Sequence, residues 1–159
     1  MKYLIILLII VSSNVLAAQH EGALGIETGV ARLSDGKNSA FGPSWLFHFE
    51  YQVDPIVGFF GQAGKSEGQS GSHRFSQNAF NGGLLFDVLP VLEFRLGVAT
   101  TVLEIENQNS TKKEHELGPL AGVTIYTQTG MWKLGASGEV IRTGSLQSTA
   151  LRLMLLMMF

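Results

Sequence analysis

Residues 150–159 read ALRLMLLMMF, an apolar run that ends the chain on an aromatic residue. Chain ends are usually polar and poorly ordered, so this run calls for a structural explanation. It is too short for a transmembrane helix, which takes about 20 apolar residues, whereas a tilted transmembrane β-strand takes only about 9–11. Alternate positions carry Leu151, Leu153, Leu155, Met157 and Phe159, which would share one face of a strand. The run therefore predicts a membrane-crossing strand.

The same alternation with a period of two recurs along the rest of the chain. Eight segments show it, at 24–31, 45–51, 57–62, 80–88, 92–102, 121–126, 132–140 and 151–159. Glycine is abundant (19 residues) and proline is scarce (4), which favours strands joined by tight turns. We expect strands of about 9–14 residues, longer than the usual 5–6 and long enough to cross a bilayer. The pattern predicts an all-β fold, a closed eight-stranded antiparallel up-and-down transmembrane β-barrel.

The connections between these segments alternate in length. Residues 34–42, 65–75 and 106–114 are long and polar, 143–147 is intermediate, and 52–55, 88–91 and 128–130 are short. Outer-membrane barrels combine short periplasmic turns with longer external loops. An even number of strands returns the chain to the side where it began, so we expect both termini in the periplasm and the long loops outside the cell.

Residues 1–17 have the three-part layout of a secretory signal peptide. Lys2 gives a basic start, residues 4–11 form a short apolar core, and Ala17 offers a small residue at a cleavage site. We therefore expect a signal peptide at 1–17 and one outer-membrane barrel domain at 18–159. The chain has no cysteine, so disulfides cannot stabilise it, and its net charge of −2 offers no basic surface for nucleic acid.

One face of the expected strands is apolar and bulky, and the other is small and polar. A soluble lipocalin-like carrier also alternates, but its apolar face lines a ligand cavity. An eight-stranded barrel has room only for filling side chains or one small ligand, and the large apolar residues of this chain would overfill it. We expect the apolar face to meet lipid and keep the carrier as an alternative. The candidates for the aromatic girdles of a membrane barrel are Trp45, Tyr51, Phe86 and Trp132.

The polar face carries charged residues that a narrow barrel would enclose. They are Glu27, His48, Glu50, Asp87, Glu93, Arg95, Lys133, Glu139 and Arg152. Charges enclosed in this way must pair with one another. We expect a packed polar lumen whose network fixes the strand register. An ion pathway or proton relay is the alternative, although eight strands are too few for a wide pore.

The C-terminal run also resembles the signal by which bacterial outer-membrane barrels are recognised for insertion. That signal is a final aromatic residue after apolar residues at alternate positions, here Leu151, Leu153, Leu155, Met157 and Phe159. Met154, Leu156 and Met158 between them are apolar too, and we expect them to pack at the periplasmic end of the barrel.

The chain as a whole is similar in layout to the small eight-stranded barrels of the OmpX/Ail and OmpA-transmembrane type. The resemblance implies a monomeric integral outer-membrane protein with a structural or surface-interaction role. Its expected partners are outer-membrane lipids and lipopolysaccharide, together with the barrel assembly machinery during insertion.

Some eight-stranded outer-membrane barrels are acyltransferases or deacylases that modify lipid A, and this is the alternative function. Such enzymes need a nucleophile with a base in reach. The candidates are His73 with Ser76, and His115 beside Glu114 and Glu116. His73 and Ser76 would face opposite sides of a strand because they are three residues apart. The sequence shows no cofactor motif or metal-ligand cluster, so we expect a protein that is not an enzyme.

Five basic residues lie at the expected external end, namely Lys65, His73, Arg74, Lys112 and Lys113. They could bridge the phosphates of lipopolysaccharide through charge-assisted hydrogen bonds. The simpler expectation is that they only solvate the loops.

Overall fold

The computed structural model describes residues 22–36, 38–71, 73–107, 110–144 and 146–159. The expected signal peptide at 1–17 lies outside the described residues. The side chains of His73, Asn107, Ser110 and Lys112 also lie outside the description.

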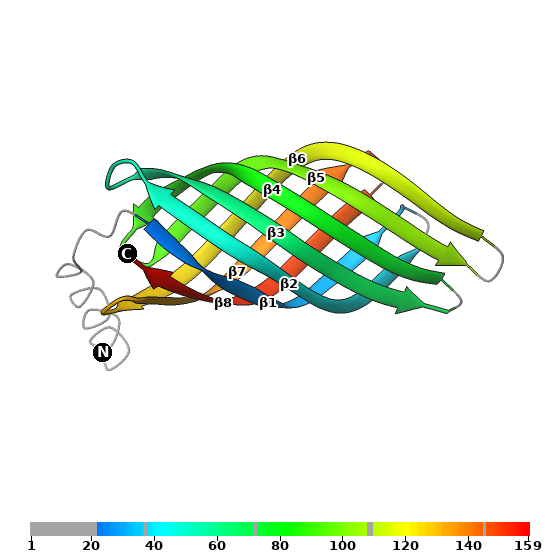
Figure 1. Cartoon of the computed structure of the whole chain (residues 1–159), viewed down its shortest axis with the longest axis horizontal. Coiled ribbons are helices and arrows are strands. Elements are labelled where there is room, and N and C mark those ends of the chain that lie inside the picture. Colours follow the sequence, from blue (N-terminus) through cyan, green and yellow to red (C-terminus); the bar gives the residue numbers. More distant parts are fainter. Residues whose placement is uncertain (1–21, 37, 72, 108–109, 145) are drawn as a thin grey trace, which may run out of the picture.

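The described residues form eight antiparallel strands that close into one barrel, which confirms the predicted fold class (Figure 1). Each strand pairs with the next along the chain, and the first pairs with the last. β1 begins and β8 ends at the same end of the barrel, here called the terminal end (Figure 1). The strands are β1 (Gly22–Ser34), β2 (Ser39–Gln52), β3 (Val57–Ser70), β4 (His73–Leu89), β5 (Leu92–Asn107), β6 (Ser110–Thr129), β7 (Trp132–Thr143) and β8 (Leu146–Met158).

The connections away from the termini, at what we call the hairpin end, are much shorter than the sequence predicts. The expected long loops at 65–75 and 106–114 are wrong, because most of their residues continue the strands. Polar residues there lie on both faces of the strands, and the backbone pairing between strands continues through pairs such as Lys65↔Asn78 and Glu104↔Lys113. Gly71, with φ of +58°, permits the tight turn between β3 and β4. The two ends therefore differ in strand extension and not in loop length.

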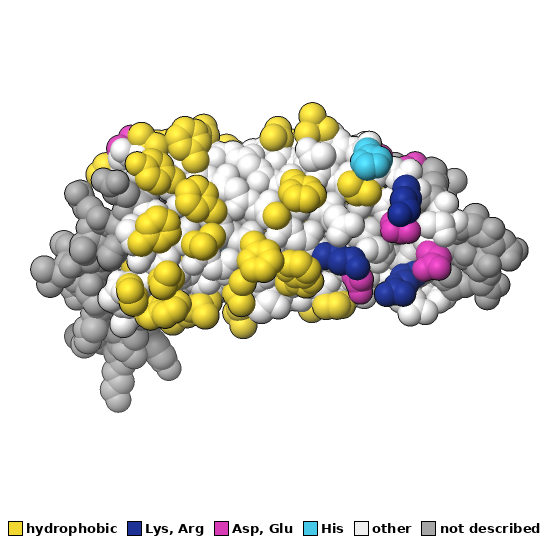
Figure 2. Space-filling model, in the orientation of Figure 1, with side chains coloured by type: hydrophobic (Ala, Val, Ile, Leu, Met, Phe, Trp, Pro, Cys, Tyr) yellow, Lys and Arg dark blue, Asp and Glu magenta, His cyan; other side chains and the backbone are white. Residues whose placement is uncertain are grey.

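The large apolar side chains point out of the barrel. Phe47, Leu153 and Ile125 are 59%, 68% and 64% exposed, whereas a lipocalin-like carrier would enclose such residues. Figure 2 shows apolar side chains over the barrel wall and charged side chains gathered toward the hairpin end. The outer surface therefore has the apolar band of a membrane barrel. The described residues contain no helix long and apolar enough to cross a membrane.

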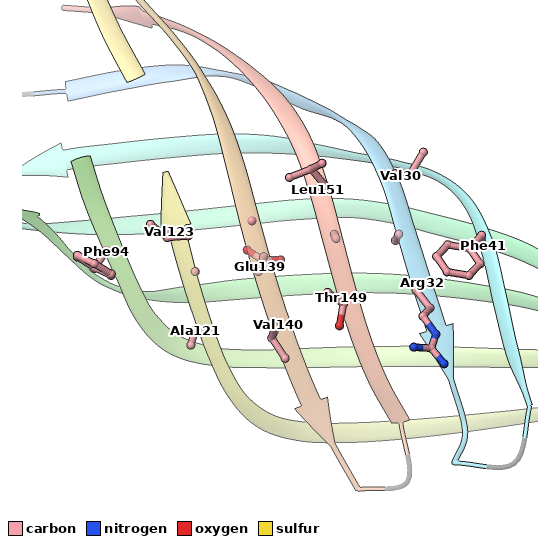
Figure 3. Close-up of a pocket in the computed structure, with 14 residues that line it drawn as sticks. Val30, Arg32, Phe41, Phe94, Ala121, Val123, Glu139, Val140, Thr149 and Leu151 are labelled. Carbon is pink, nitrogen blue, oxygen red and sulfur yellow. The ribbon is translucent and has the colours of Figure 1, made fainter. Parts of the chain in front are cut away.

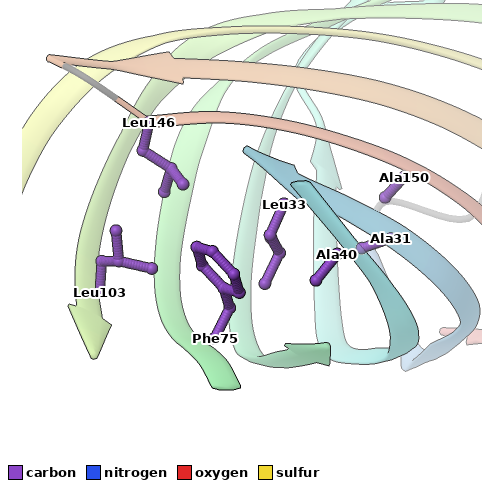
Figure 4. Packing of buried hydrophobic residues seen from close by; sticks show 7 residues of the cluster. All are labelled: Ala31, Leu33, Ala40, Phe75, Leu103, Leu146 and Ala150. Atoms are coloured by element: carbon purple, nitrogen blue, oxygen red, sulfur yellow. The ribbon is translucent and has the colours of Figure 1, made fainter. Parts of the chain in front are cut away.

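Two apolar clusters close the interior of the barrel near its ends. The first lies at the hairpin end and consists of Ala31, Leu33, Ala40, Phe75, Leu103, Leu146 and Ala150 (Figure 4). The second lies at the terminal end and consists of Ala23, Tyr126, Met154, Leu156 and Met158. The sequence analysis expected apolar packing at the terminal end but missed the cluster at the hairpin end. At the terminal end the apolar cluster lies beside lumen charges, because the register places Ala23 opposite Glu50 and Leu156 opposite Lys133.

Candidate functional site

Glu27 on β1 lies at the centre of the polar lumen. Its Oε1 atom accepts a hydrogen bond from Nη1 of Arg95 at 2.7 Å and lies 2.6 Å from Nδ1 of His48. The amide of Gln62 also donates to Oε1, at 3.1 Å. The Oε2 atom accepts from the hydroxyl of Ser137 at 2.7 Å. Five strands thus converge on one carboxylate that has no solvent exposure.

Lys133 on β7 forms a second centre nearer the terminal end. Its Nζ atom donates to Glu50 on β2 and to Glu93 on β5, both at 2.7 Å. His48 links this centre to the first, because its Nε2 atom lies 3.0 Å from Oε1 of Glu50. Arg95 provides another link, with Nε 3.5 Å from Oε1 of Glu93. The two centres therefore form one continuous network.

Arg152 on β8 extends the network toward the hairpin end. Its guanidinium donates to Oε1 of Glu139 at 3.0 Å and to the hydroxyl of Ser44 at 2.8 Å. It also lies 3.9 Å from Oε2 of Glu27. Ser44 in turn accepts a hydrogen bond from the hydroxyl of Ser66 at 2.8 Å. The alternation of strand residues brings these side chains inward, and the closure of the barrel brings them together.

The structure places eight of the nine expected lumen residues in this network. Four of them are glutamates, three are Lys or Arg, and the eighth is His48, so a proton on His48 would make the group neutral. Asp87 lies apart, where it accepts hydrogen bonds from the hydroxyl of Tyr126 at 2.9 Å and the amide of Gln52 at 2.6 Å. The sequence analysis did not single out the uncharged partners Ser44, Gln62, Ser66, Asn81, Thr124 and Ser137. Their inward positions on the strands were the available signal.

The geometry of this network suits a structural role. Its charged groups are engaged with one another inside the barrel wall and are almost fully buried. The part of the chain that the structure describes contains no group of three or more His, Cys, Asp or Glu residues arranged to hold a metal ion. Filling the lumen with paired charges fixes which face of each strand points inward.

The enzyme candidates are not brought into a common arrangement with the network. Ser76 belongs to the outward-facing set of β4, and the side chain of its candidate partner His73 lies outside the described residues. His115 is exposed on the outer face of β6, whereas its neighbours Glu114 and Glu116 belong to the other face.

The residues expected at the membrane surface lie on the outer face. Trp45, Tyr51 and Trp132 are exposed, and Phe86 is half-buried. Leu151, Leu153, Leu155, Met157 and Phe159 are all exposed. Phe159 and Gly22 exchange backbone hydrogen bonds of 2.9 and 3.1 Å, which completes the seam between β8 and β1.

Carboxylates accompany the three basic residues at the hairpin end whose side chains the structure describes, out of the five that the sequence analysis named. Lys65 pairs with Glu67, and the guanidinium of Arg74 lies 3.8 Å from the same carboxylate. Lys113 lies 3.3 Å from Glu104. These local pairs reduce the positive charge that the three side chains would offer to a phosphate.

The barrel wall is uneven at the hairpin end, where β5 and β6 project furthest (Figure 1). β6 pairs with β5 from Ser110 to Ile125, but its pairing with β7 starts only at Leu120. β7 ends at Thr143, which continuation of the register places opposite Gly118. Residues 110–117 therefore run past the end of β7 with no described strand on that side.

No protein-family model matches the chain, and neither does any curated protein. Among solved structures, it is similar to Ail, the attachment invasion locus protein of Yersinia pestis. The two are 13% identical with a TM-score of 0.60, over 89% of this chain and 100% of Ail. Ail in complex with the heparin analogue sucrose octasulfate gives 15% identity and a TM-score of 0.61, over 87% of this chain and 99% of that one.

Neisserial surface protein A (NspA) is also similar, with 14% identity and a TM-score of 0.68, over 87% of this chain and 97% of NspA. The resemblance to small eight-stranded outer-membrane barrels that the sequence showed is thus confirmed at the level of the fold. These identities are too low to carry a role from one protein to another.

Proposed function

We propose that this chain is a small outer-membrane protein that binds a polypeptide at the cell surface through the projecting part of its barrel wall. The hairpin end faces outward in this proposal, and the termini lie in the periplasm. The lumen network serves to hold the barrel together, and insertion follows recognition of the β8 run by the barrel assembly machinery. Similarity to Ail and NspA, whose names refer to attachment and to a surface protein, supports the general kind of function.

The projection of β6 at residues 110–117 past the end of β7 is the observation that carries this proposal. An unpaired strand edge presents a row of backbone N–H and C=O groups, and an extended peptide can add to it as another strand. The edge stands beyond the apolar band, so such a peptide would approach from water. The exposed side chains of Lys113, His115 and Leu117 alternate along it and could select among partners.

The pairing of Lys65, Arg74 and Lys113 with carboxylates favours a polypeptide over a polyanion at the projecting part of the wall. Ail is known in complex with a sulfated sugar, and a similar ligand would need available cations on this chain. Here Lys65, Arg74 and Lys113 are accompanied by Glu67 or Glu104. Backbone pairing does not depend on those charges, and it therefore fits the described surface better.

Shortening the β5–β6 hairpin tests this function. Deleting the cross-strand pairs Glu104↔Lys113, Ile105↔Lys112 and Glu106↔Thr111 together removes projecting edge while keeping the turn. The matched control exchanges the charges of one pair, Glu104→Lys with Lys113→Glu, and leaves the backbone edge in place. Bacteria producing each form would be tested for attachment to immobilised extracellular-matrix proteins and to immobilised heparin.

We expect the shortened form to lose attachment to a matrix protein and the charge exchange to retain it. Undiminished attachment by the shortened form would contradict the edge as the binding surface. Attachment of the unaltered protein to heparin alone, lost on charge exchange, would indicate a polyanion. Attachment no greater than that of cells lacking the protein would contradict the surface-interaction function itself.

A further inference from the structure

A hollow lies in the outer wall of the barrel, on the side that faces the membrane. It has a volume of about 660 Å³ and is formed by β6, β7, β8 and β1, with Phe41 of β2 and Phe94 of β5 at its margins (Figure 3). This volume falls in the range of about 300–1,000 Å³ that is usual for small-ligand sites. Glu139 of the lumen network is among the lining residues, but its carboxylate is buried and pairs with Arg152 on the lumen side of the wall.

Gly138 on β7 explains why the wall is hollowed there. The register places Gly138 directly between Leu151 on β8 and Val123 on β6, so two larger side chains flank a position that has none. A Cβ atom added to Gly138 would meet only Cγ1 of Val123, at 3.8 Å. Leu151 is 64% exposed, and it stands beside this gap as a wall. The result is an apolar trough across three strands.

Two arginines lie at the hairpin-end side of the trough. Arg32 on β1 lines it, with its guanidinium carbon 5.9 Å from the centre of the Phe41 ring (Figure 3). Arg142 is exposed two residues beyond Val140, another lining residue, on the same face of β7. Neither arginine has a carboxylate within ion-pair distance among the described residues, in contrast to Lys65, Arg74 and Lys113.

We propose that the trough binds one phosphorylated membrane lipid, with an acyl chain lying over Gly138 and the phosphate held by Arg32 and Arg142. The register and the usual strand spacing put the two arginine Cα atoms roughly 12 Å apart. Long side chains can converge on one headgroup across that distance. Guanidinium groups form strong, often bidentate hydrogen bonds with phosphate. This site is distinct from the attachment surface, because its lining residues on β6 are Ala121, Gly122 and Val123, which lie outside residues 110–117, and because it faces lipid.

The two arginines without carboxylate partners indicate that the occupant of the trough is a lipid and not a second copy of the chain. Two copies meeting symmetrically at this face would bring Arg32 and Arg142 of both molecules together, and like charges at an interface are unfavourable. An anionic lipid instead satisfies the apolar trough and the arginines at once. The positions of the arginines and the trough also match the headgroup and the acyl chain of a lipid. The arginines lie at the hairpin-end margin of the apolar band, and the trough extends from there into that band.

Native mass spectrometry of the full mature chain released from detergent micelles tests the proposal. The probes are dimyristoyl phosphatidylglycerol, which is anionic, and dimyristoyl phosphatidylcholine, which has the same acyl chains and no net charge. Gly138→Leu fills the trough, and Arg32→Gln with Arg142→Gln removes its charges. The matched controls are Gly61→Leu, since a Cβ on Gly61 of β3 has open space around it, and Arg74→Gln, which removes a cation that has a carboxylate neighbour.

We expect one phosphatidylglycerol to stay bound to the unaltered chain. Gly138→Leu and the double arginine variant should each weaken its binding at least about tenfold, and the two controls should not. Equal retention of both lipids, or unchanged binding by either trough variant, would overturn the proposal. A dimer without lipid would overturn it in favour of a second copy. Heat-dependent mobility on gels shows that each variant is folded, and the two trough substitutions act independently of each other.

Discussion

Glu27→Gln tests whether the lumen is a dry, mutually paired structure. The substitution keeps the shape of the side chain and removes its charge. Glu27 accepts hydrogen bonds from Arg95, Gln62 and Ser137 and lies against His48, with no exposure to solvent. Once its charge is gone, the nearest remaining carboxylate of Arg95 is Glu93, at 3.5 Å. The guanidinium would then be buried with a much weaker counterion.

The expected loss follows from that burial. Removing one partner of a buried ion pair costs about 3–5 kcal/mol, because the other charge stays buried without compensation. We expect Glu27→Gln to lower the free energy of unfolding by this amount, and Arg95→Met to do the same. Combining the two removes both charges, so the double variant should lose about 2–3 kcal/mol less than the sum of the single losses.

Urea unfolding in lipid vesicles, followed by tryptophan fluorescence and by heat-dependent gel mobility, measures these losses. The matched control is Glu67→Gln, the same chemical change in a pair with Lys65 at the barrel surface. Exposed ion pairs contribute about 0.2–1 kcal/mol, so the control should change stability by no more than that.

A loss from Glu27→Gln no larger than the loss from Glu67→Gln would refute the reasoning. Water in the lumen would then screen the charge of Glu27, and the network could not be the dry structure that its contacts indicate. The ion pathway that the sequence left as an alternative would become the better hypothesis. Conductance of single barrels in planar bilayers would be the measurement to follow.

Three further outcomes test other parts of the structure. Gly29→Ala should destabilise the barrel by about 1–3 kcal/mol in the same urea titration, because the new Cβ would overlap the backbone oxygen of Leu151 on β8, whereas Gly61→Ala has open space and should be neutral. Leu155→Arg, in the middle of the lipid-facing row of β8, should cost about 2–4 kcal/mol in vesicles and much less in detergent. In the turn after β2, backbone N–H groups lower the pKa of Asp54, so its contribution is present above the unfolded pKa of about 3.9 and is lost as the pH falls through the folded value. The stability difference between the unaltered protein and Asp54→Asn should therefore shrink as the pH is lowered below about 3.9.

The sequence predicts the strands best where one face is apolar. β2 and β5 carry large residues at alternate positions, and this period marks them clearly as strands. The extensions of β3 to β6 beyond the membrane escape the same criterion. Around Lys65 and Lys113 both faces are polar or small, so the sequence there resembles a loop although the backbone pairing continues. Backbone hydrogen bonding between strands makes those segments part of the sheet, and the hydropathy pattern of the sequence does not reveal it.

The sequence predicts which residues face the lumen, because alternate positions of each strand point inward. It does not predict which of these residues contact one another. Glu27 meets Arg95 and Ser137, which lie 68 and 110 residues further along the chain. Residues so far apart in the sequence come together only because the barrel closes, with β1 paired to β8 in one particular register. The trough over Gly138 is hidden for the same reason, since Leu151 and Val123 become its walls only once β6, β7 and β8 are aligned.

The register of β8 shows what a lumen charge can decide. Around Met154 and Leu156 both faces of this strand are apolar, so a slip by one residue would change hydrophobic burial little. The slip would, however, turn Arg152 from Glu139 toward lipid, where an arginine costs about 2–4 kcal/mol. It would also break the paired backbone hydrogen bonds between Phe159 and Gly22. One buried charge and one end-of-strand pairing therefore settle an orientation that the apolar pattern of β8 leaves open.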